Sequence, residues 1–481
     1  MSVTLRQRYM LLSVFVTLTI LLTGFYLHNN LRPLTSLHPP EPPLPTETGP
    51  KHPIYKTSKP PKSYPIIDNF PLALNAHSAS ELPPIPKWNQ PPNPHVPEKT
   101  PLLIGFTRNW RLLQQVVVSY ITAGWPPEDI YVVENTGVMH SNKDGQLSLQ
   151  NPFFLNHTRL NMLGVNILIT PTLFTFAQIQ NYFLWTAIEN QWPTYFWSHM
   201  DLAILSFEDQ WIASHPDELH PSPLNFPSLY DHCITALRNV TTPNPETGLV
   251  TPWALEFFSY DRLALVNTDS YQKVGGWDTM IPFYGTDCDM HERLAMEGFE
   301  MRDWPAGAIW DVASSLDDLE VLYRKKGGPV PSFVDPNAIE EELAQINTTT
   351  SDSSPTEPDN TSNLQPRDIN LNLGTLFSDK KHKQWHDEPI AQESWKKLLE
   401  VLDRMGWSKG ANKNGRNTWQ GRQVGGVNDP YYRDSEGFEL GIQMQIEHGR
   451  KVFAEKWGHR DCDLRAQGLG PGDAWRVVRD W

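Results

Sequence analysis

Residues 101 to 137, PLLIGFTRNWRLLQQVVVSYITAGWPPEDIYVVENTG, decide the fold class of this chain. The run PLLIGF is short and apolar, which is typical of a buried strand. Apolar residues then recur at helical spacing as far as a glycine, and a second apolar run, DIYVVENTG, ends on polar residues. A strand, a helix and a second strand in this order predict a parallel βαβ unit and therefore an α/β fold.

The alternation continues along the chain. VNILITP, at 165 to 171, reads as a third strand, FAQIQNYFLWTAIENQW, at 176 to 192, as a helix, and YFWSHMDLAIL, at 195 to 205, as a fourth strand interrupted by polar residues. Ligands of such sheets bind at the carboxyl ends of the strands. Glu134, Asn135 and the SHMD group lie at those ends.

The SHMD group has two interpretations. His199 and Asp201 are two residues apart, so in an extended chain both point the same way and could reach one divalent ion. Alternatively, the segment is a turn in which Asp201 accepts backbone hydrogen bonds.

A second acidic motif, FYGTDCDMHERL, at 283 to 294, also has two interpretations. Thr286 and Asp289 fit the capping-box pattern of a helix start, where acids are favoured by the helix dipole. Asp287, which lies between them, is instead a candidate for binding a metal or accepting a proton. Gly298 is the expected end of the helix.

The N-terminal region predicts a membrane anchor. Residues 10 to 28 are uncharged and almost continuously apolar, which is long enough for a transmembrane helix. Arg6 and Arg8 precede the span, so the positive-inside rule leaves residues 1 to 9 in the cytosol. The expected topology is single-pass type II, with the rest of the chain luminal or extracellular.

Composition predicts the remaining boundaries. Residues 29 to 100 hold nearly half of the 43 prolines and indicate an extended stem, or alternatively a proline-rich ligand for a partner domain. The globular domain is expected over 101 to 330, a low-complexity disordered insertion over 331 to 370, and a helix-rich segment over 371 to 481.

Charge and modification signals agree with a secretory protein. The net charge of −15 argues against a nucleic-acid binder, because phosphate attraction needs basic patches. Glycosylation sequons begin at Asn156, Asn239, Asn347 and Asn360. Three cysteines allow at most one internal disulfide, and the sequence does not choose the pair.

The order of these parts resembles a family. The stretch VGGWDTMIPFYGTDCDMHERLAMEGF, at 274 to 299, follows the strand ends VVENTG and HMD as it does in GT-A-fold glycosyltransferases. The likeness is greatest to the inverting family-2 group and its β-1,4-galactosyltransferase-like relatives, whose pattern is G-G-[FW]-D followed by Y-G-E-D-x-D-x-x-x-R-[LM]. It spans roughly residues 101 to 315.

The resemblance implies a role for each candidate residue. Thr107, Glu134 and Asn135 would contact the nucleotide. Asp201, His199 and Asp311 would hold a divalent metal, Mn²⁺ in this family, although His199 stands where the family has a carboxylate and imidazole suits softer metals better. Asp287 falls on the position of the catalytic base, and Thr286 replaces the acid that usually precedes it.

The function that follows is a Golgi or ER membrane glycosyltransferase. It would move a sugar from a nucleotide-linked donor, expected to be a UDP-sugar, to a glycan or glycoprotein acceptor with inversion. The metal would offset the charge of the departing diphosphate, and the base would deprotonate the acceptor hydroxyl. The alternatives are a non-catalytic luminal glycan-binding or scaffold protein with the same fold, and a glycoside hydrolase with paired carboxylates.

Overall fold

The computed structural model describes residues 17–19, 21–23, 65–209, 226–335, 384–390, 392–411, 429, 431 and 435–481. The chain divides into two compact units, Met1–Lys59 and Pro60–Trp481. Only six residues of the predicted membrane span, 17–19 and 21–23, are described, and they are helical. Within the described ranges, no helix has the length and apolar character needed to cross a bilayer. Most of the span at 10 to 28 lies outside these ranges, so the anchor stays a prediction.

A seven-stranded sheet organises the second unit, in the order β3-β2-β1-β4-β7-β6-β8. Its strands are β1 (Leu102–Phe106), β2 (Ile130–Glu134), β3 (Asn166–Ile169), β4 (Thr194–Ser198), β6 (Trp253–Phe257), β7 (Leu263–Asn267) and β8 (Glu300–Asp303). Strands β1 to β4 pair in parallel, β7 is antiparallel to β4 and β6, and β8 is parallel to β6. The predicted α/β class with a mostly parallel sheet is confirmed.

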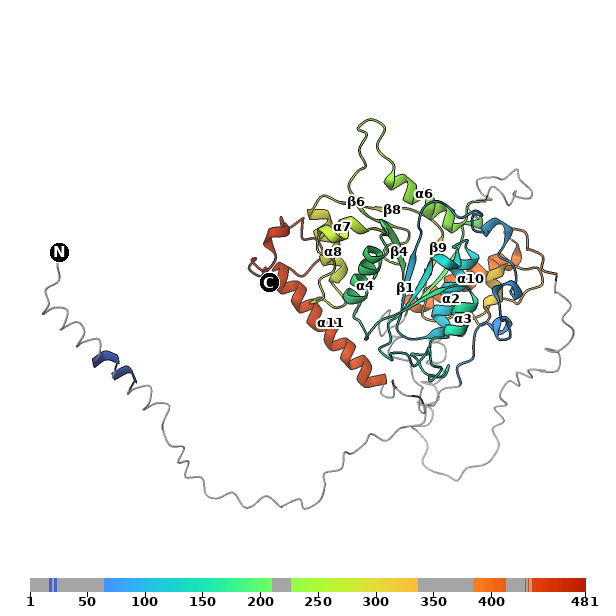
Figure 1. Ribbon diagram of the computed structural model, residues 1–481, viewed down its shortest axis with the longest axis horizontal. Helices are drawn as coiled ribbons and strands as arrows, with labels where there is room; N and C mark the ends of the chain where they lie inside the picture. The colour runs from blue at the N-terminus through green and yellow to red at the C-terminus, as the bar shows by residue number, and fades with distance from the viewer. Residues whose placement is uncertain are drawn as a thin grey trace, which may run out of the picture. The chain divides into compact units, whose positions relative to one another are not determined.

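Helices cover both faces of this sheet. They are α2 (Trp110–Thr122), α3 (His157–Met162), α4 (Phe176–Glu189), α6 (Leu229–Thr241), α7 (Thr268–Lys273), α8 (Thr286–Met296), α10 (Glu393–Gly410) and α11 (Ser435–Trp457). Figure 1 shows α4, α7 and α8 on one side of the sheet and α2, α3 and α10 on the other. Each side has its own apolar core. The strands lie between the two cores, and their residues are buried on both faces of the sheet.

The segment YFWSHMDLAIL does not form one strand. It divides into β4 and β5 (Leu202–Leu205), and β5 pairs antiparallel with β9 (Ala308–Asp311) in a separate two-stranded sheet. The polar residues between β4 and β5 mark the point at which the chain leaves the large sheet. The register places Leu202 opposite Asp311, so Asp201 is brought beside Asp311.

The globular unit begins earlier than the predicted residue 101. Residues 65 to 100 form three short 3-10 helices, η1 (Pro71–Ala73), η2 (Ala79–Glu81) and η3 (Lys87–Asn89). Phe70 and Leu82 belong to the main core, and Trp88 is also buried. Proline removes backbone donors but does not prevent the apolar residues between the prolines from packing, so this part of the predicted stem is part of the folded unit. A further 3-10 helix, η4 (Pro127–Asp129), precedes β2, and η5 (Leu319–Tyr323) and η6 (Pro471–Asp473) lie further along.

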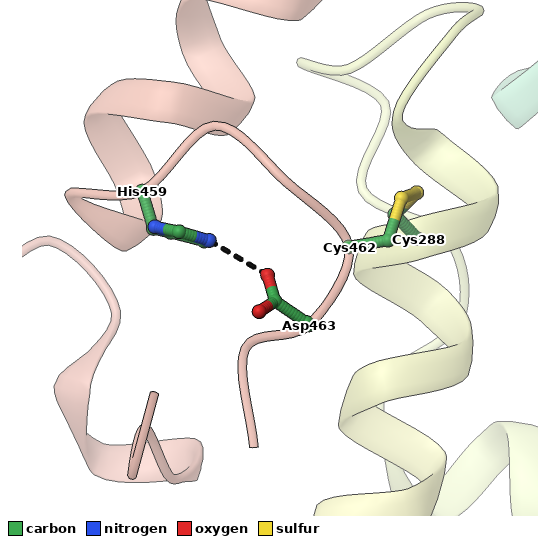
Figure 2. The surroundings of a disulfide bond; sticks show 4 residues. All are labelled: Cys288, His459, Cys462 and Asp463. Carbon is green, nitrogen blue, oxygen red and sulfur yellow. Dashed lines mark hydrogen bonds and ion pairs between the residues drawn. A yellow bond between two sulfur atoms is a disulfide. The ribbon is translucent and has the colours of Figure 1, made fainter. Parts of the chain in front are cut away.

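The C-terminal segment is helical, as its 3.6-residue periodicity predicts. Helix α10 packs on β9, and α11 lies along α8. All three cysteines lie in described residues: Cys288 of α8 forms a disulfide with Cys462, and Cys233 is buried and unpaired. Figure 2 shows this disulfide beside the loop that follows α11. The disulfide therefore ties the last part of the chain to the helix that carries Asp287.

Candidate functional site

A cavity of about 610 Å³ opens at the carboxyl edge of the large sheet. Strand β1 is flanked by β2 on one side and β4 on the other, so the strand order reverses there, which is where α/β sheets bind ligands. Thr107 follows β1, Asn135 follows β2 and His199 follows β4, and all three line the cavity. The cavity therefore gathers predicted residues from three strand ends.

Helix α11 forms one wall of the cavity. Phe438, Glu439, Ile446 and Arg450 of this helix line it, opposite the strand ends. The sequence predicted that 371 to 481 is helical but assigned it no role, and the amphipathic pattern alone does not say which partner its apolar face meets. The C-terminal segment completes the site.

Arg108 is a lining residue that sequence reasoning missed. Only 3% of this residue is exposed, and its guanidinium lies 3.4 Å from a carboxylate oxygen of Glu439 and 4.8 Å from the ring centre of Phe438. A buried cation is costly unless it meets an anion. Its position directly after β1, ahead of α2, is the signal that could have identified it, because strand-to-helix turns at switch points bind phosphates.

The two predicted residues at the end of β2, Glu134 and Asn135, differ in whether they line the cavity. Asn135 lines the cavity and anchors its rim: its side-chain oxygen accepts from the Phe174 backbone N–H at 2.6 Å, and its amide donates to the Phe174 carbonyl at 2.9 Å. Glu134 is buried and accepts from Asn142 at 2.7 Å, and its other carboxylate oxygen is 2.7 Å from Nε2 of His157. Glu134 is therefore held by Asn142 and His157 and does not line the cavity.

Asp201 and Asp311 meet around a lysine. The ammonium of Lys409, from α10, is 2.6 Å from Asp201 Oδ2 and 2.5 Å from Asp311 Oδ1. Nδ1 of His199 is 3.7 Å from Asp201. Burial disfavours the charged form of Asp201, but the charges of Lys409 and His199 outweigh it and hold the pKa of Asp201 well below its usual range. Burial also disfavours the charged form of His199. The hydrogen bond to Asp201 and the charges of the neighbouring carboxylates outweigh this effect and raise the pKa of His199.

The predicted metal residues thus come together with a cation already among them. Among the residues that the structure describes, no group of three or more His, Cys, Asp or Glu side chains is arranged to hold a metal ion. A divalent ion bridging Asp201 and Asp311 would compete with the ammonium of Lys409 for the same carboxylates. The residues as arranged do not fit the Mn²⁺ that the sequence predicted.

Asp287 lines the cavity at the N-terminus of α8. The predicted capping box is wrong: the N-cap is Gly285, at φ 88°, with no side-chain cap hydrogen bond. Thr286 is 1% exposed and lines the cavity, and within the described residues its hydroxyl has no hydrogen-bond partner. Gly285 begins the helix instead because it adopts the left-handed conformation without a steric cost.

Asp289 is buried behind the cavity. Its carboxylate is 2.8 Å from Nε of Arg293 and 2.6 Å from Nζ of Lys456, and it accepts from the Trp457 indole at 2.9 Å. The last two residues belong to α11. Asp289 therefore fixes α11 against α8, whereas the other acid of the motif, Asp287, lines the cavity. Gly298, at φ 82°, ends α8 as predicted.

The turn between β6 and β7 contributes two further lining residues that sequence reasoning did not single out. Tyr260 adopts a left-handed conformation, with φ 49°, which is rare for a bulky residue and is enriched at functional sites. Burial, with smaller effects from Asp287 and Asp261, raises the pKa of Tyr260 to about 12. Asp261 lies 3.8 Å from Nε2 of His199. The polar turn SYDR between two apolar runs was the available signal.

Comparisons with known proteins find no match by sequence and only weak matches among solved structures. No protein-family model and no curated protein sequence matches the chain. Among solved structures, a mannosyltransferase from Pyrobaculum calidifontis, in complex with GDP-mannose and Mn²⁺, matches 45% of this chain and 58% of its own, with 14% identity and a TM-score of 0.27. A cytidylyltransferase from Leptospira borgpetersenii matches 54% of this chain and 100% of its own, with 11% identity and a TM-score of 0.26. Scores this low carry no argument, so the activity must be inferred from the site.

Proposed function

We propose that this protein is a glycosyltransferase that moves a sugar from a nucleotide-linked donor to a glycan or glycoprotein acceptor with inversion. One observation carries the proposal. A carboxylate at a helix N-terminus, Asp287, and a buried guanidinium, Arg108, line the same cavity at the switch point of an α/β sheet. A carboxylate that accepts a proton as a base and a cation that holds a diphosphate are the two charges that this reaction needs.

The nucleotide would lie along the strand ends. Thr107 and Asn135 supply polar groups there, and Phe176 and Trp197 supply aromatic surface for the base. Arg108 would pair with the diphosphate, since guanidinium groups bind phosphate oxygens in a bidentate manner. Arg450, on the facing wall, adds a second positive charge. A UDP-sugar remains the expected donor.

The acceptor would approach past the turn between β6 and β7. Tyr260 and Tyr284 line the cavity and are 56% and 47% exposed, so their rings offer flat apolar surface at its rim. Asp287 would accept the proton of the attacking hydroxyl. Asp287 lies at the positive end of α8, which attracts negative charge.

We further propose a luminal, type II location in the Golgi or ER membrane. The Cys288–Cys462 disulfide supports an oxidising compartment. Asn239, in a sequon, is exposed on α6, where a glycan can be attached. The apolar segment 10 to 28 would be the anchor.

The alternative is a non-catalytic glycan-binding protein, which would retain the cavity without turnover. Lys409 between the two acids favours it, because the metal site of an active family member is then altered. It predicts glycan binding with no release of nucleotide from any donor.

The test is nucleotide release by the full-length protein in detergent. UDP-, GDP- and CMP-sugars are supplied with a panel of glycan acceptors, each with Mn²⁺ or with chelator. The proposal predicts release from one donor that increases when an acceptor is added. Absence of both release and binding for every donor contradicts it, and glycan binding alone supports the alternative.

A further inference from the structure

Lys409 lies where two carboxylates would otherwise meet a metal. Its ammonium is within 2.6 Å of both Asp201 and Asp311, and the three residues are 2%, 5% and 9% exposed. Asp201 also lines the cavity, whereas Lys409 and Asp311 do not. The ammonium of Lys409 therefore offsets the negative charge of Asp201 and Asp311 without lining the cavity.

The lysine is held there by the packing of its helix. Asp403, on the same helix, accepts from the Trp310 indole at 2.7 Å. Ser408 donates to Asp335 at 2.7 Å, and a side chain at Gly406 would meet Trp310 at 3.5 Å. These contacts hold the turns of α10 that precede Lys409 against β9 and against Asp335.

The charges also explain why a lysine is tolerated at this position. Two buried carboxylates close together repel each other, so each needs a cation. One ammonium donates a hydrogen bond to each of them, although it carries one positive charge where a divalent ion carries two. The cost of burying Lys409 is offset by the two ion pairs, whereas a lysine beside a bound divalent cation would be repelled by it.

We propose that Lys409 is a built-in cation that takes the place of the divalent metal, so that this site binds no Mn²⁺ and donor binding does not depend on metal. Metal binding at this site does not depend on the proposed function. Metal-independent donor binding does rest on it, with Arg108 and Arg450 offsetting the charge of the diphosphate.

The test measures Mn²⁺ binding to the full-length protein by the loss of its free electron paramagnetic resonance signal. Wild type should leave the signal unchanged. Lys409→Met removes the charge at similar length and leaves Asp201, Asp311 and His199 without the competing ammonium, so it should gain Mn²⁺ binding that wild type lacks, seen as a loss of the free Mn²⁺ signal. The double variant Lys409→Met with Asp201→Asn should lose this gain.

Thermal unfolding gives a second measurement on the same proteins. Lys409→Met removes the cation that the two buried carboxylates share, so its Tm should fall and should recover when Mn²⁺ is added. Lys456→Met is the matched control: this lysine is also paired with two carboxylates, Asp278 and Asp289, but Asp289 keeps its ion pair with Arg293, so the Tm should fall without recovering in Mn²⁺.

The wild-type measurement decides the proposal even if Lys409→Met does not fold. Stoichiometric Mn²⁺ binding by wild type that Asp201→Asn abolishes would overturn it. A folded Lys409→Met protein that binds no Mn²⁺ would overturn it as well, because the two acids would then not form a latent metal site. Neither result depends on whether any sugar is transferred, so failure of the proposed function is recognised separately.

Discussion

The contact between α8 and α11 allows the sharpest stability prediction. Asp289 is fully buried, and its carboxylate lies within 3 Å of Arg293, Lys456 and the Trp457 indole. Asp289→Asn keeps the size of the side chain and an acceptor for Trp457 but removes the negative charge. Arg293 and Lys456 are then left facing each other without their shared anion.

The cost follows from the burial of these groups. Removing one partner of a buried ion pair typically costs about 3–5 kcal/mol, since the remaining charge stays uncompensated. Arg293 also donates to two backbone carbonyls, of Val274 and Gly276, at 2.7 Å, so it cannot withdraw into solvent. In a folded unit of this size each kcal/mol shifts Tm by about 2 °C, which predicts a decrease of about 6–10 °C.

Differential scanning fluorimetry under non-reducing conditions measures the decrease. Asp269→Asn is the control, because Asp269 is exposed near the start of α7 and its loss should change Tm by less than about 1 °C. A decrease for Asp289→Asn no larger than that of the control would refute the assignment of Asp289 as the anchor of α11.

Three further predictions test the site and its support. Arg108→Met should raise the donor Kd by about 10- to 100-fold in isothermal titration, because it removes a charge-assisted contact worth roughly 1.5–3 kcal/mol. Replacing Cys288 and Cys462 by serine opens a loop of 174 residues and should lower the free energy of unfolding by about 2–4 kcal/mol, measured in urea; no change would contradict the cross-link. Burial, partly offset by Arg302, raises the pKa of Glu256 to about 7 in the folded protein. The free energy of unfolding should therefore decrease as the pH rises from about 4.5, the pKa of this group in the unfolded chain, towards 7. Glu256→Gln should remove this loss and have the higher Tm at pH 8 but not at pH 4; equal Tm values at pH 8 would contradict the shift.

The large sheet was predictable because its signals are local. The alternation of β1, α2 and β2 is written in apolar periodicity, and α10 and α11 follow the same rule. The position of Asp287 at a helix start was equally readable. Such patterns specify which residues share a face, and this is enough to place strand ends together at one edge.

The rest depends on contacts between distant segments. Lys409 is 208 residues from Asp201 and 98 from Asp311, and no local pattern distinguishes it from a solvated lysine at the end of an amphipathic helix. The split of 195 to 205 into two sheets was hidden for a similar reason, since β5 exists only through its pairing with β9. Arg108 is marked as a lining residue only by its position between β1 and α2, not by a motif of its own.

The Thr286 and Asp289 pattern shows how a motif can be satisfied in sequence and unused in structure. A capping box requires the threonine to lie just outside the helix, but Gly285 takes that position and moves Thr286 into the first turn. Asp289 then points to α11, because Lys456 and Trp457 of that helix, together with Arg293 of α8, compensate its charge more strongly than one backbone N–H would. Long-range packing overrode the local preference.

The most direct test of the account compares transfer by wild type, Asp287→Asn and Asp269→Asn on the donor and acceptor pair found active. If Asp287 accepts the proton of the acceptor, its amide variant should bind the donor as wild type does and transfer sugar about 10²- to 10⁴-fold more slowly, while Asp269→Asn is unchanged. Transfer by Asp287→Asn within a few-fold of wild type would contradict the central claim.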